Sequence, residues 1–146
     1  MITGGSRGIR LGTATHLTSQ GWALTLTARD ADQLDRARAM LLRYDEPVAV
    51  VACDLEEDAS AERVVAEHQK TFGSLNALFM AAGVGSAAPL DRYPMTRFDK
   101  QLAVNLRAPF ALTTLVLPLL QSGARNQSVE VQGTIRAYPD AGQSRD

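Results

Sequence analysis

The stretch Met1-Ile2-Thr3-Gly4-Gly5-Ser6-Arg7-Gly8-Ile9 decides the fold, because it joins a short apolar segment, a glycine-rich turn and the start of an amphipathic segment. Glycines lack a Cβ, so such a turn lets backbone N–H groups approach a bound phosphate at the N-terminus of the following helix. The stretch therefore predicts a strand stub at residues 1–2, a phosphate-binding turn and a helix over residues 9–20. An ordinary glycine-rich turn between strand and helix has the same local pattern, so the rest of the chain must distinguish the two.

The remainder of the chain alternates short apolar runs with longer amphipathic runs, a pattern typical of repeated strand-helix units with a parallel sheet. Strands are predicted at residues 22–28, 48–52, 75–82 and 128–131. Helices are predicted at residues 31–43, around 64–72, at 91–106 with an interruption at Pro94, and at 109–121 with a kink or early end at Pro118. The pattern predicts an α/β fold of about five parallel strands with flanking helices over residues 1–131, followed by an irregular tail at residues 132–146.

Composition excludes several classes of protein. The 146 residues carry 15 basic and 16 acidic side chains in a mixed order, so no extended field attracts a nucleic acid or an anionic membrane surface. No run approaches the roughly 20 uninterrupted apolar residues of a membrane span. Cys53 is the only cysteine and the histidines, His16 and His68, lie far apart, which argues against a disulfide framework and a metal cluster. We therefore expect a cytoplasmic protein without a metal, nucleic-acid or membrane partner.

A basic side chain stands where the second predicted strand ends. Arg29 lies about 20 residues beyond Gly8, where the dinucleotide-binding fold places its ribose-reading side chain, and no acidic residue ends that strand. Arg29 and Arg7 are expected to bind a 2′-phosphate from two sides, which favours NADP(H) over NAD(H). Two alternatives stay open at this point: both arginines are solvated surface charges, or Asp30 faces the ribose instead of capping the next helix.

Five short motifs follow one another in a recognisable order: Thr3-Gly4-x-x-x-Gly8, Ala28-Arg29, Cys53-Asp54-Leu55, Ala81-Ala82-Gly83 and Val104-Asn105-Leu106. With these motifs, residues 2–131 resemble the short-chain dehydrogenase/reductase family. The resemblance implies a doubly wound Rossmann fold and hydride transfer between a nicotinamide ring and a carbonyl or alcohol of a small substrate. It also implies that the apolar helix at residues 109–121 packs on the sheet, forms the subunit interface of a homo-oligomer, or does both.

The resemblance also assigns roles to individual residues. It implies that Asp54 binds the adenine amino group, that Gly83 lies beside the adenosine ribose, and that Asn105 is a catalytic residue holding a water in a proton relay. The implied cofactor-binding set is Thr3, Gly4, Ser6, Arg7, Gly8, Ile9, Arg29, Asp54, Leu55, Ala82 and Gly83.

The chain departs from the family pattern near its start and after the fourth predicted strand. Arg10 stands where the family has its third glycine, so its side chain is expected either to crowd the turn or to reach a phosphate. Gly12 is expected to restore part of the close approach of the first helix to the strand and to a bound pyrophosphate. Residues 80–83 read Met-Ala-Ala-Gly and lack the amide side chain that ties neighbouring strands together in the family.

The catalytic Tyr and Lys of the family are also missing. None of the three tyrosines is followed four residues later by a lysine, and the only lysines are Lys70 and Lys100. Thr134 lies near the expected position of the family's serine. Two hypotheses follow. The first is an NADP(H)-dependent oxidoreductase represented by an incomplete chain that is not itself catalytically competent. The second is a non-catalytic nucleotide-binding module or a degenerate fragment.

Overall fold

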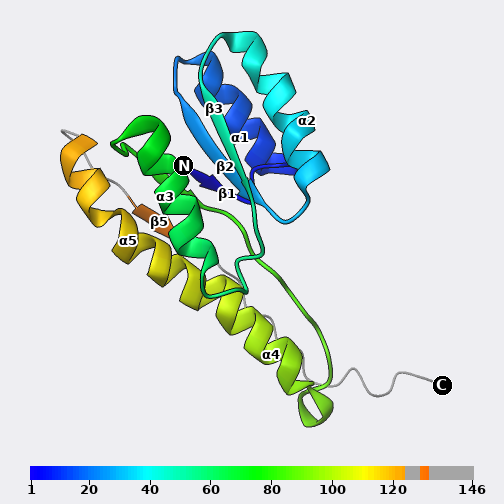
Figure 1. The fold of residues 1–146 in the computed structure, drawn as a ribbon. Coiled ribbons are helices and arrows are strands. Elements are labelled where there is room, and N and C mark those ends of the chain that lie inside the picture. The colour runs from blue at the N-terminus through cyan, green and yellow to red at the C-terminus, as the bar shows by residue number, and fades with distance from the viewer. Residues whose placement is uncertain (124–128, 132–146) are drawn as a thin grey trace.

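A computed structural model describes residues 1–123 and 129–131 of the chain. Its five strands form one parallel sheet in the order β3-β2-β1-β4-β5 (Figure 1). The strands are β1 (Ile2–Thr3), β2 (Leu24–Ala28), β3 (Val48–Ala52), β4 (Leu78–Met80) and β5 (Val129–Val131). This order is the one in which a doubly wound sheet reverses its winding direction beside its first strand. The predicted parallel α/β fold is confirmed, and the predicted tail at residues 132–146 lies outside the described residues.

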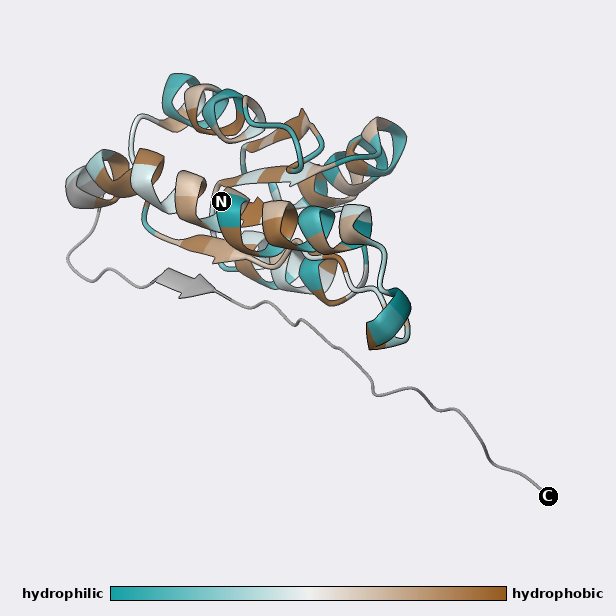
Figure 2. Ribbon diagram, turned by 90° about the horizontal axis from the view of Figure 1, so that it is seen from below, coloured by the Kyte–Doolittle hydropathy of each residue, from teal (hydrophilic) through white to brown (hydrophobic). Residues whose placement is uncertain are grey.

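Helices separate the strands and cover the sheet. They are α1 (Gly8–Ser19), α2 (Ala31–Leu41), α3 (Ser60–Phe72), α4 (Met95–Leu102) and α5 (Ala108–Gly123). Three short elements join them: the 3₁₀ turns η1 (Leu42–Tyr44) and η2 (Leu90–Arg92) and the π-helical η3 (Ala103–Arg107). The helices carry hydrophilic and hydrophobic residues side by side in Figure 2, as expected for helices with one buried face.

Both faces of the sheet are buried. Successive residues of β2 point to opposite sides, and the residues Leu24 to Thr27 are all buried. Leu24 and Leu26 pack in a cluster with residues of α1 and α2, among them Ala14 and Leu34. A second cluster joins β4 to α3 and α5 and includes Val64, Leu78, Leu112 and Val116. Each face of the sheet therefore has its own hydrophobic core, which is the physical basis of the doubly wound arrangement.

The second face of β2 carries buried hydroxyl groups, and each has a partner. The Oγ1 atom of Thr25 lies 2.8 Å from Nδ1 of His68, and Thr27 Oγ1 lies 2.9 Å from Sγ of Cys53. His68 also bonds through Nε2 to the carbonyl oxygen of Ser74 at 3.0 Å. Both ring nitrogens of this buried histidine are thus engaged, and burial lowers the pKa of His68.

We expect stability to fall as the pH drops below about 6.5, the usual pKa of histidine. The pKa of His68 is lowered in the folded state, so in this range the unfolded chain binds more protons and acid favours unfolding. One such group lowers the free energy of unfolding by at most about 1.4 kcal/mol per pH unit. The check is the thermal midpoint of wild type and His68→Gln from pH 8 to pH 5.

His16→Gln is the matched control, because His16 is exposed on α1. The loss of stability below pH 6.5 should be smaller in His68→Gln and unchanged in His16→Gln. Identical pH profiles for wild type and His68→Gln would show that His68 contributes nothing to acid sensitivity.

The fourth strand is shorter than the predicted residues 75–82. Before the strand, the backbone N–H of Leu75 donates to the carbonyl oxygen of Leu119 in α5 at 3.0 Å. After it, the N–H of Ala82 donates to the side chain of Thr3 at 3.0 Å, and the carbonyl of Ala81 accepts from Arg10 at 3.1 Å. The backbone groups of Leu75, Ala81 and Ala82, which the prediction placed in the strand, are thus hydrogen-bonded to a helix carbonyl or to side chains.

The two helices predicted at residues 91–106 and 109–121 form one continuous helical run. Pro94 precedes α4 and does not interrupt it: the carbonyl of Pro94 accepts from the N–H groups of Arg97 and Phe98. The π-helical η3 joins α4 to α5, and α5 continues through Pro118 to Gly123, so the predicted early end is wrong. Val116 and Leu119, on either side of Pro118, are buried and hold this part of α5 against the core.

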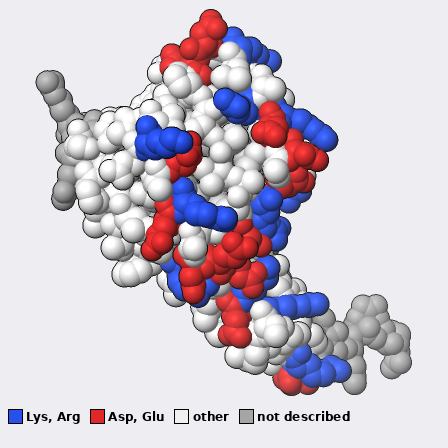
Figure 3. Space-filling view, viewed as in Figure 1, with Lys and Arg blue, Asp and Glu red and all other residues white. Residues whose placement is uncertain are grey.

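The run Met95–Leu120 is long and apolar enough to cross a membrane by length and composition alone. Within the structure, 39% of its most apolar stretch is buried, and the inward side of α5 packs against α3. Its outward side exposes Leu106, Phe110 and Leu117. The margin of the molecule formed by α5 accordingly shows few charged side chains in Figure 3, whereas both signs of charge mix elsewhere on that face.

Candidate functional site

A cavity of about 520 Å³ opens at the carboxyl ends of β1, β2, β3 and β4. Pockets that bind small molecules and cofactors commonly have volumes of about 300–1,000 Å³. Of the residues predicted to bind a cofactor, the cavity brings together Gly4, Ser6, Arg7, Arg29, Asp54, Leu55, Ala82 and Gly83. Thr3, Gly8, Ile9 and Asn105 do not line it.

The glycine-rich turn is anchored to the end of β2. The N–H groups of Gly4 and Gly5 both donate to the carbonyl oxygen of Thr27, at 2.6 and 3.1 Å. A Cβ on Gly5 would lie 2.9 Å from the side chain of Leu26, so the turn passes close to this strand. The first turn of α1 contains no acidic residue, and its N-cap residue, Arg7, makes no side-chain cap. The N-terminus of α1 therefore presents uncompensated positive charge to the cavity.

Thr3 has a structural role next to this turn. Its side chain is 1% exposed and accepts the N–H of Ala82, which joins the end of β1 to the segment after β4. The family's amide is missing at residues 80–83, and this hydroxyl supplies a cross-strand bond at the same end of the sheet. Gly8 and Ile9 lie on the exposed side of the turn, where Ile9 is 90% exposed.

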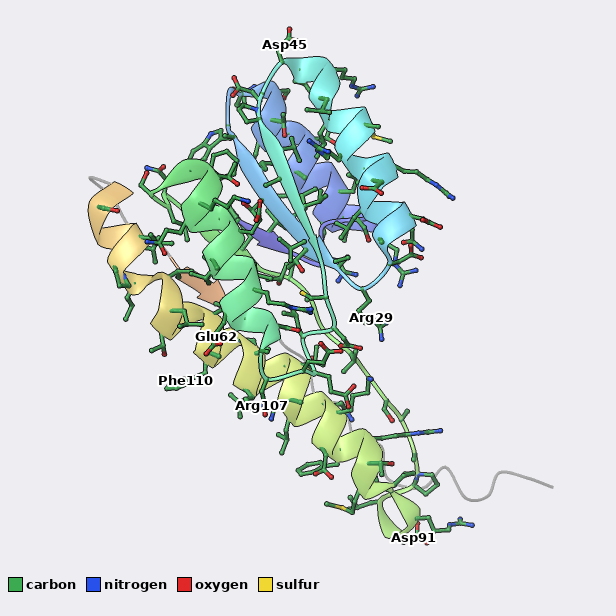
Figure 4. All side chains as sticks on the ribbon, in the orientation of Figure 1. Arg29, Asp45, Glu62, Asp91, Arg107 and Phe110 are labelled. Carbon is green, nitrogen blue, oxygen red and sulfur yellow. The ribbon has the colours of Figure 1, made fainter. Side chains whose placement is uncertain are left out.

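Arg29 extends from the carboxyl end of β2 (Figure 4). Its side chain is 61% exposed, and Nη1 lies 4.0 Å from an oxygen of Asp54. The other Asp54 oxygen accepts the backbone N–H of Glu56 at 3.1 Å, so that carboxylate is oriented by its own loop. An exposed ion pair at this separation contributes little stability, which leaves the Arg29 guanidinium available to a ligand.

Asp30 caps α2, which is the main interpretation of this residue from the sequence. One carboxylate oxygen accepts the backbone N–H of Gln33 at 2.9 Å, and the other accepts the side-chain amide of Gln33 at 2.8 Å. Gln33 also lines the cavity and was missed by the sequence analysis. The sequence signal was available, because an acidic cap followed three residues later by glutamine is the pattern of a reciprocal cap.

Arg10 crosses the glycine-rich turn. It sits in the first turn of α1, its Nη1 donates to the carbonyl oxygen of Ala81 at 3.1 Å, and its side chain lines the cavity. A Cβ on Gly4 would lie only 2.5 Å from this Nη1. The expectation that Gly12 restores a close approach is wrong, because a Cβ there would meet no atom within 4 Å.

Asn105 lies in η3 and holds the segment that follows β4. Its Oδ1 accepts the N–H of Val84 at 2.9 Å, and its Nδ2 donates to the carbonyl of the same residue at 2.8 Å. A Cβ on Gly83 would lie 3.4 Å from that Oδ1. The side chain thus positions one wall of the cavity, and its role in a proton relay stays a prediction.

A group of ionic contacts braces the loop between β3 and α3. Lys100 pairs with Glu56, and Arg107 pairs with Asp58 at 2.6 Å while donating to the Glu56 carbonyl at 2.6 Å. These contacts tie α4 and η3 to the loop that carries Asp54. Within residues 1–123 and 129–131, no three His, Cys, Asp or Glu side chains form a group able to hold a metal ion.

Comparison with known proteins agrees with this geometry. A family model described as short chain dehydrogenase matches residues 1–144. A rhamnolipid-biosynthesis 3-oxoacyl-[acyl-carrier-protein] reductase of Pseudomonas aeruginosa is 32% identical over 124 residues, which are 85% of this chain and 48% of that protein. The chain spans about half the length of the curated relatives it matches.

Two solved structures illustrate the likeness in three dimensions. A metagenomic short-chain oxidoreductase in complex with NADP superposes with a TM-score of 0.81 and 29% identity, over 88% of this chain and 58% of that one. An NAD⁺-bound xylitol dehydrogenase superposes with a TM-score of 0.75 and 25% identity, over 83% of this chain and 47% of that one.

Proposed function

The chain belongs to the short-chain dehydrogenase family, and from this premise we propose that residues 1–131 form the cofactor-binding part of an NADP(H)-dependent oxidoreductase. When bound, the nicotinamide would exchange a hydride with a carbonyl or alcohol of a small substrate. The observation that carries the proposal is the cavity at the carboxyl ends of the strands, where the glycine-rich turn and Arg29 meet. Nicotinamide cofactors bind at this edge of a doubly wound sheet.

Each part of the cavity suits one part of the cofactor. The N-terminus of α1, with Ser6, would hold the pyrophosphate, because its N–H groups and helix dipole favour an anion, and Arg7 would share the 2′-phosphate with Arg29. Asp54 would accept a hydrogen bond from the adenine amino group. Leu55, Ala82 and Gly83 would form the walls beside adenine and ribose.

Preference for NADP(H) is argued from Arg29 and Asp30. Arg29 is exposed at the cavity and paired only weakly, so it is free to bind a 2′-phosphate by charge-assisted hydrogen bonds. Asp30 also lines the cavity, but each of its two oxygens already accepts a hydrogen bond from Gln33, so this carboxylate is engaged in capping α2. The similar solved structures include both an NADP complex and an NAD⁺ complex. The preference of this chain for NADP(H) over NAD(H) is therefore tested by direct titration.

Titration of the purified chain with NADPH and NADH tests the function. Wild type should bind NADPH more tightly, and Arg29→Ala should weaken NADPH binding by about tenfold to a hundredfold while leaving NADH binding unchanged. This range corresponds to one lost hydrogen bond between charged groups. Nucleotide fluorescence and thermal shift provide two independent readouts.

Arg43→Ala is the control, because Arg43 is an exposed arginine in η1, at the end of α2 remote from Asp30. It should bind both nucleotides like wild type. A folded wild-type chain that binds neither nucleotide would contradict the proposed function. Equal weakening of NADPH and NADH by Arg29→Ala would contradict the 2′-phosphate assignment alone.

A second candidate is nucleotide binding without turnover by these 146 residues. The observation that favours it is the absence of any tyrosine followed four residues later by lysine, because that pair is the general acid/base of the resembled family. Saturable NADPH binding without oxidation of NADPH by carbonyl substrates would support this candidate. Oxidation above the background rate would contradict it.

The exposed side of the long helical run supports a proposal about assembly. Leu106, Phe110 and Leu117 are 63%, 74% and 46% exposed, and Phe110 points away from the sheet (Figure 4). A face of this composition favours association, and we propose a homo-oligomer that buries it. Sedimentation of the purified chain distinguishes a monomer from an oligomer.

A further inference from the structure

We propose that Arg10 is a phosphate-binding residue of the cofactor site, with its guanidinium placed to hold the pyrophosphate of the dinucleotide above the Gly4 turn. The inference rests on the proposed function and assigns a ligand to the position at which this chain departs from the glycine pattern. It concerns the pyrophosphate and is separate from the 2′-phosphate assigned to Arg29.

The position of the side chain is the first argument. Arg10 starts in α1 and reaches the segment after β4, where Nη1 donates to the Ala81 carbonyl at 3.1 Å. A Cβ on Gly4 would lie 2.5 Å from Nη1 and 3.2 Å from Cδ of Arg10. The guanidinium therefore lies against the bare Cα of Gly4, inside the cavity that also contains Ser6 and Arg7. A pyrophosphate bound at the N-terminus of α1 would be within reach of this guanidinium.

Unused hydrogen-bonding capacity is the second argument. A guanidinium has five N–H donors, and within the part of the chain that the structure describes, Arg10 donates only to a neutral carbonyl and pairs with no carboxylate. A hydrogen bond to a phosphate is roughly twice as strong as one between neutral groups. Arg10 can therefore bind a phosphate with its free donors, or exchange the Ala81 carbonyl for it.

The charges around the cavity are the third argument. The two carboxylates that line the cavity, Asp30 and Asp54, form no ion pair with Arg10 in the part of the chain that the structure describes: Asp54 faces Arg29, and Asp30 accepts hydrogen bonds from Gln33. The first turn of α1 contributes no acidic side chain. Among the described residues, Arg7, Arg10 and the helix N-terminus thus bring positive charge to the cavity without a direct ion pair to a carboxylate, which favours the binding of a pyrophosphate.

Three ligands separate the two phosphate sites. NADPH carries a pyrophosphate and a 2′-phosphate, ADP-ribose carries only the pyrophosphate, and adenosine 2′-monophosphate carries only the 2′-phosphate. Arg10→Ala should weaken NADPH and ADP-ribose by about tenfold to a hundredfold and leave adenosine 2′-monophosphate unchanged. Arg29→Ala should show the complementary pattern, weakening NADPH and adenosine 2′-monophosphate but not ADP-ribose.

Each outcome of these titrations decides a question. Arg43→Ala, the charge-matched control, should bind all three ligands like wild type. Unchanged or tighter binding of NADPH and ADP-ribose by Arg10→Ala would overturn the inference and show that Arg10 shields the turn. Failure of the folded wild type to bind any ligand would instead overturn the proposed function. Should Arg10→Ala not fold, Arg10→Gln replaces it, because glutamine keeps a long polar side chain without the charge: weaker ADP-ribose binding supports the inference, and binding equal to or tighter than wild type overturns it.

Discussion

Gly4→Ala is expected to lower the affinity for NADPH by about a hundredfold. Gly4 has φ +72°, a conformation that costs a residue with a side chain about 1–2 kcal/mol. The new Cβ would also lie 2.5 Å from Nη1 of Arg10 and 3.1 Å from the Cα of Ala82. Arg10 can swing aside, but the Cα of Ala82 belongs to the backbone, so the turn or this segment must shift by a few tenths of an ångström.

A shifted turn misaligns the N–H groups that face the phosphate. Each hydrogen bond to a charged group contributes about 1.5–3 kcal/mol, so losing one or two gives the stated hundredfold. The measurement is NADPH titration of Gly4→Ala, with folding verified by circular dichroism.

Gly12→Ala is the matched control for this prediction. Gly12 also lies in α1, its φ is not in the left-handed region, and a Cβ there meets nothing within 4 Å. It should bind NADPH like wild type and should stabilise α1 by about 0.5–1 kcal/mol. NADPH affinity unchanged in Gly4→Ala would show that the turn does not contact the cofactor.

Leu112→Ala is expected to reduce the free energy of unfolding by about 2–5 kcal/mol. Leu112 is 1% exposed on the side of α5 that packs with α3 and β4. Alanine would remove apolar contacts and leave a cavity that the flanking helices cannot fill completely. A loss of this size is a large part of the 5–15 kcal/mol that typically stabilises a domain.

Urea denaturation of wild type, Leu112→Ala and Met40→Ala measures this effect. Met40 is 44% exposed on α2, so its replacement should change the free energy of unfolding by no more than about 0.5 kcal/mol. Equal denaturation midpoints for wild type and Leu112→Ala would mean that α5 does not pack on the second face of the sheet as described.

The sequence by itself determined the features that depend on neighbouring residues. The glycine-rich turn, the Asp30 cap and the helix end at Gly73 follow from local backbone and side-chain chemistry, and the structure has each of them. The alternation of apolar runs determined the parallel sheet, because strands covered on both faces need helices between them. The residues predicted to bind adenine and the phosphates reach one cavity for the same reason: each follows the end of a parallel strand.

Only the tertiary structure decided the features that join distant residues. The short β4, the two bonds of Asn105 to Val84 and the reach of Arg10 to Ala81 depend on groups 21 to 79 positions apart. The continuous helical run depends on packing that overrides the local effect of Pro118. Periodicity and local propensity report which face of an element is apolar, whereas such contacts arise only when the sheet brings remote segments together.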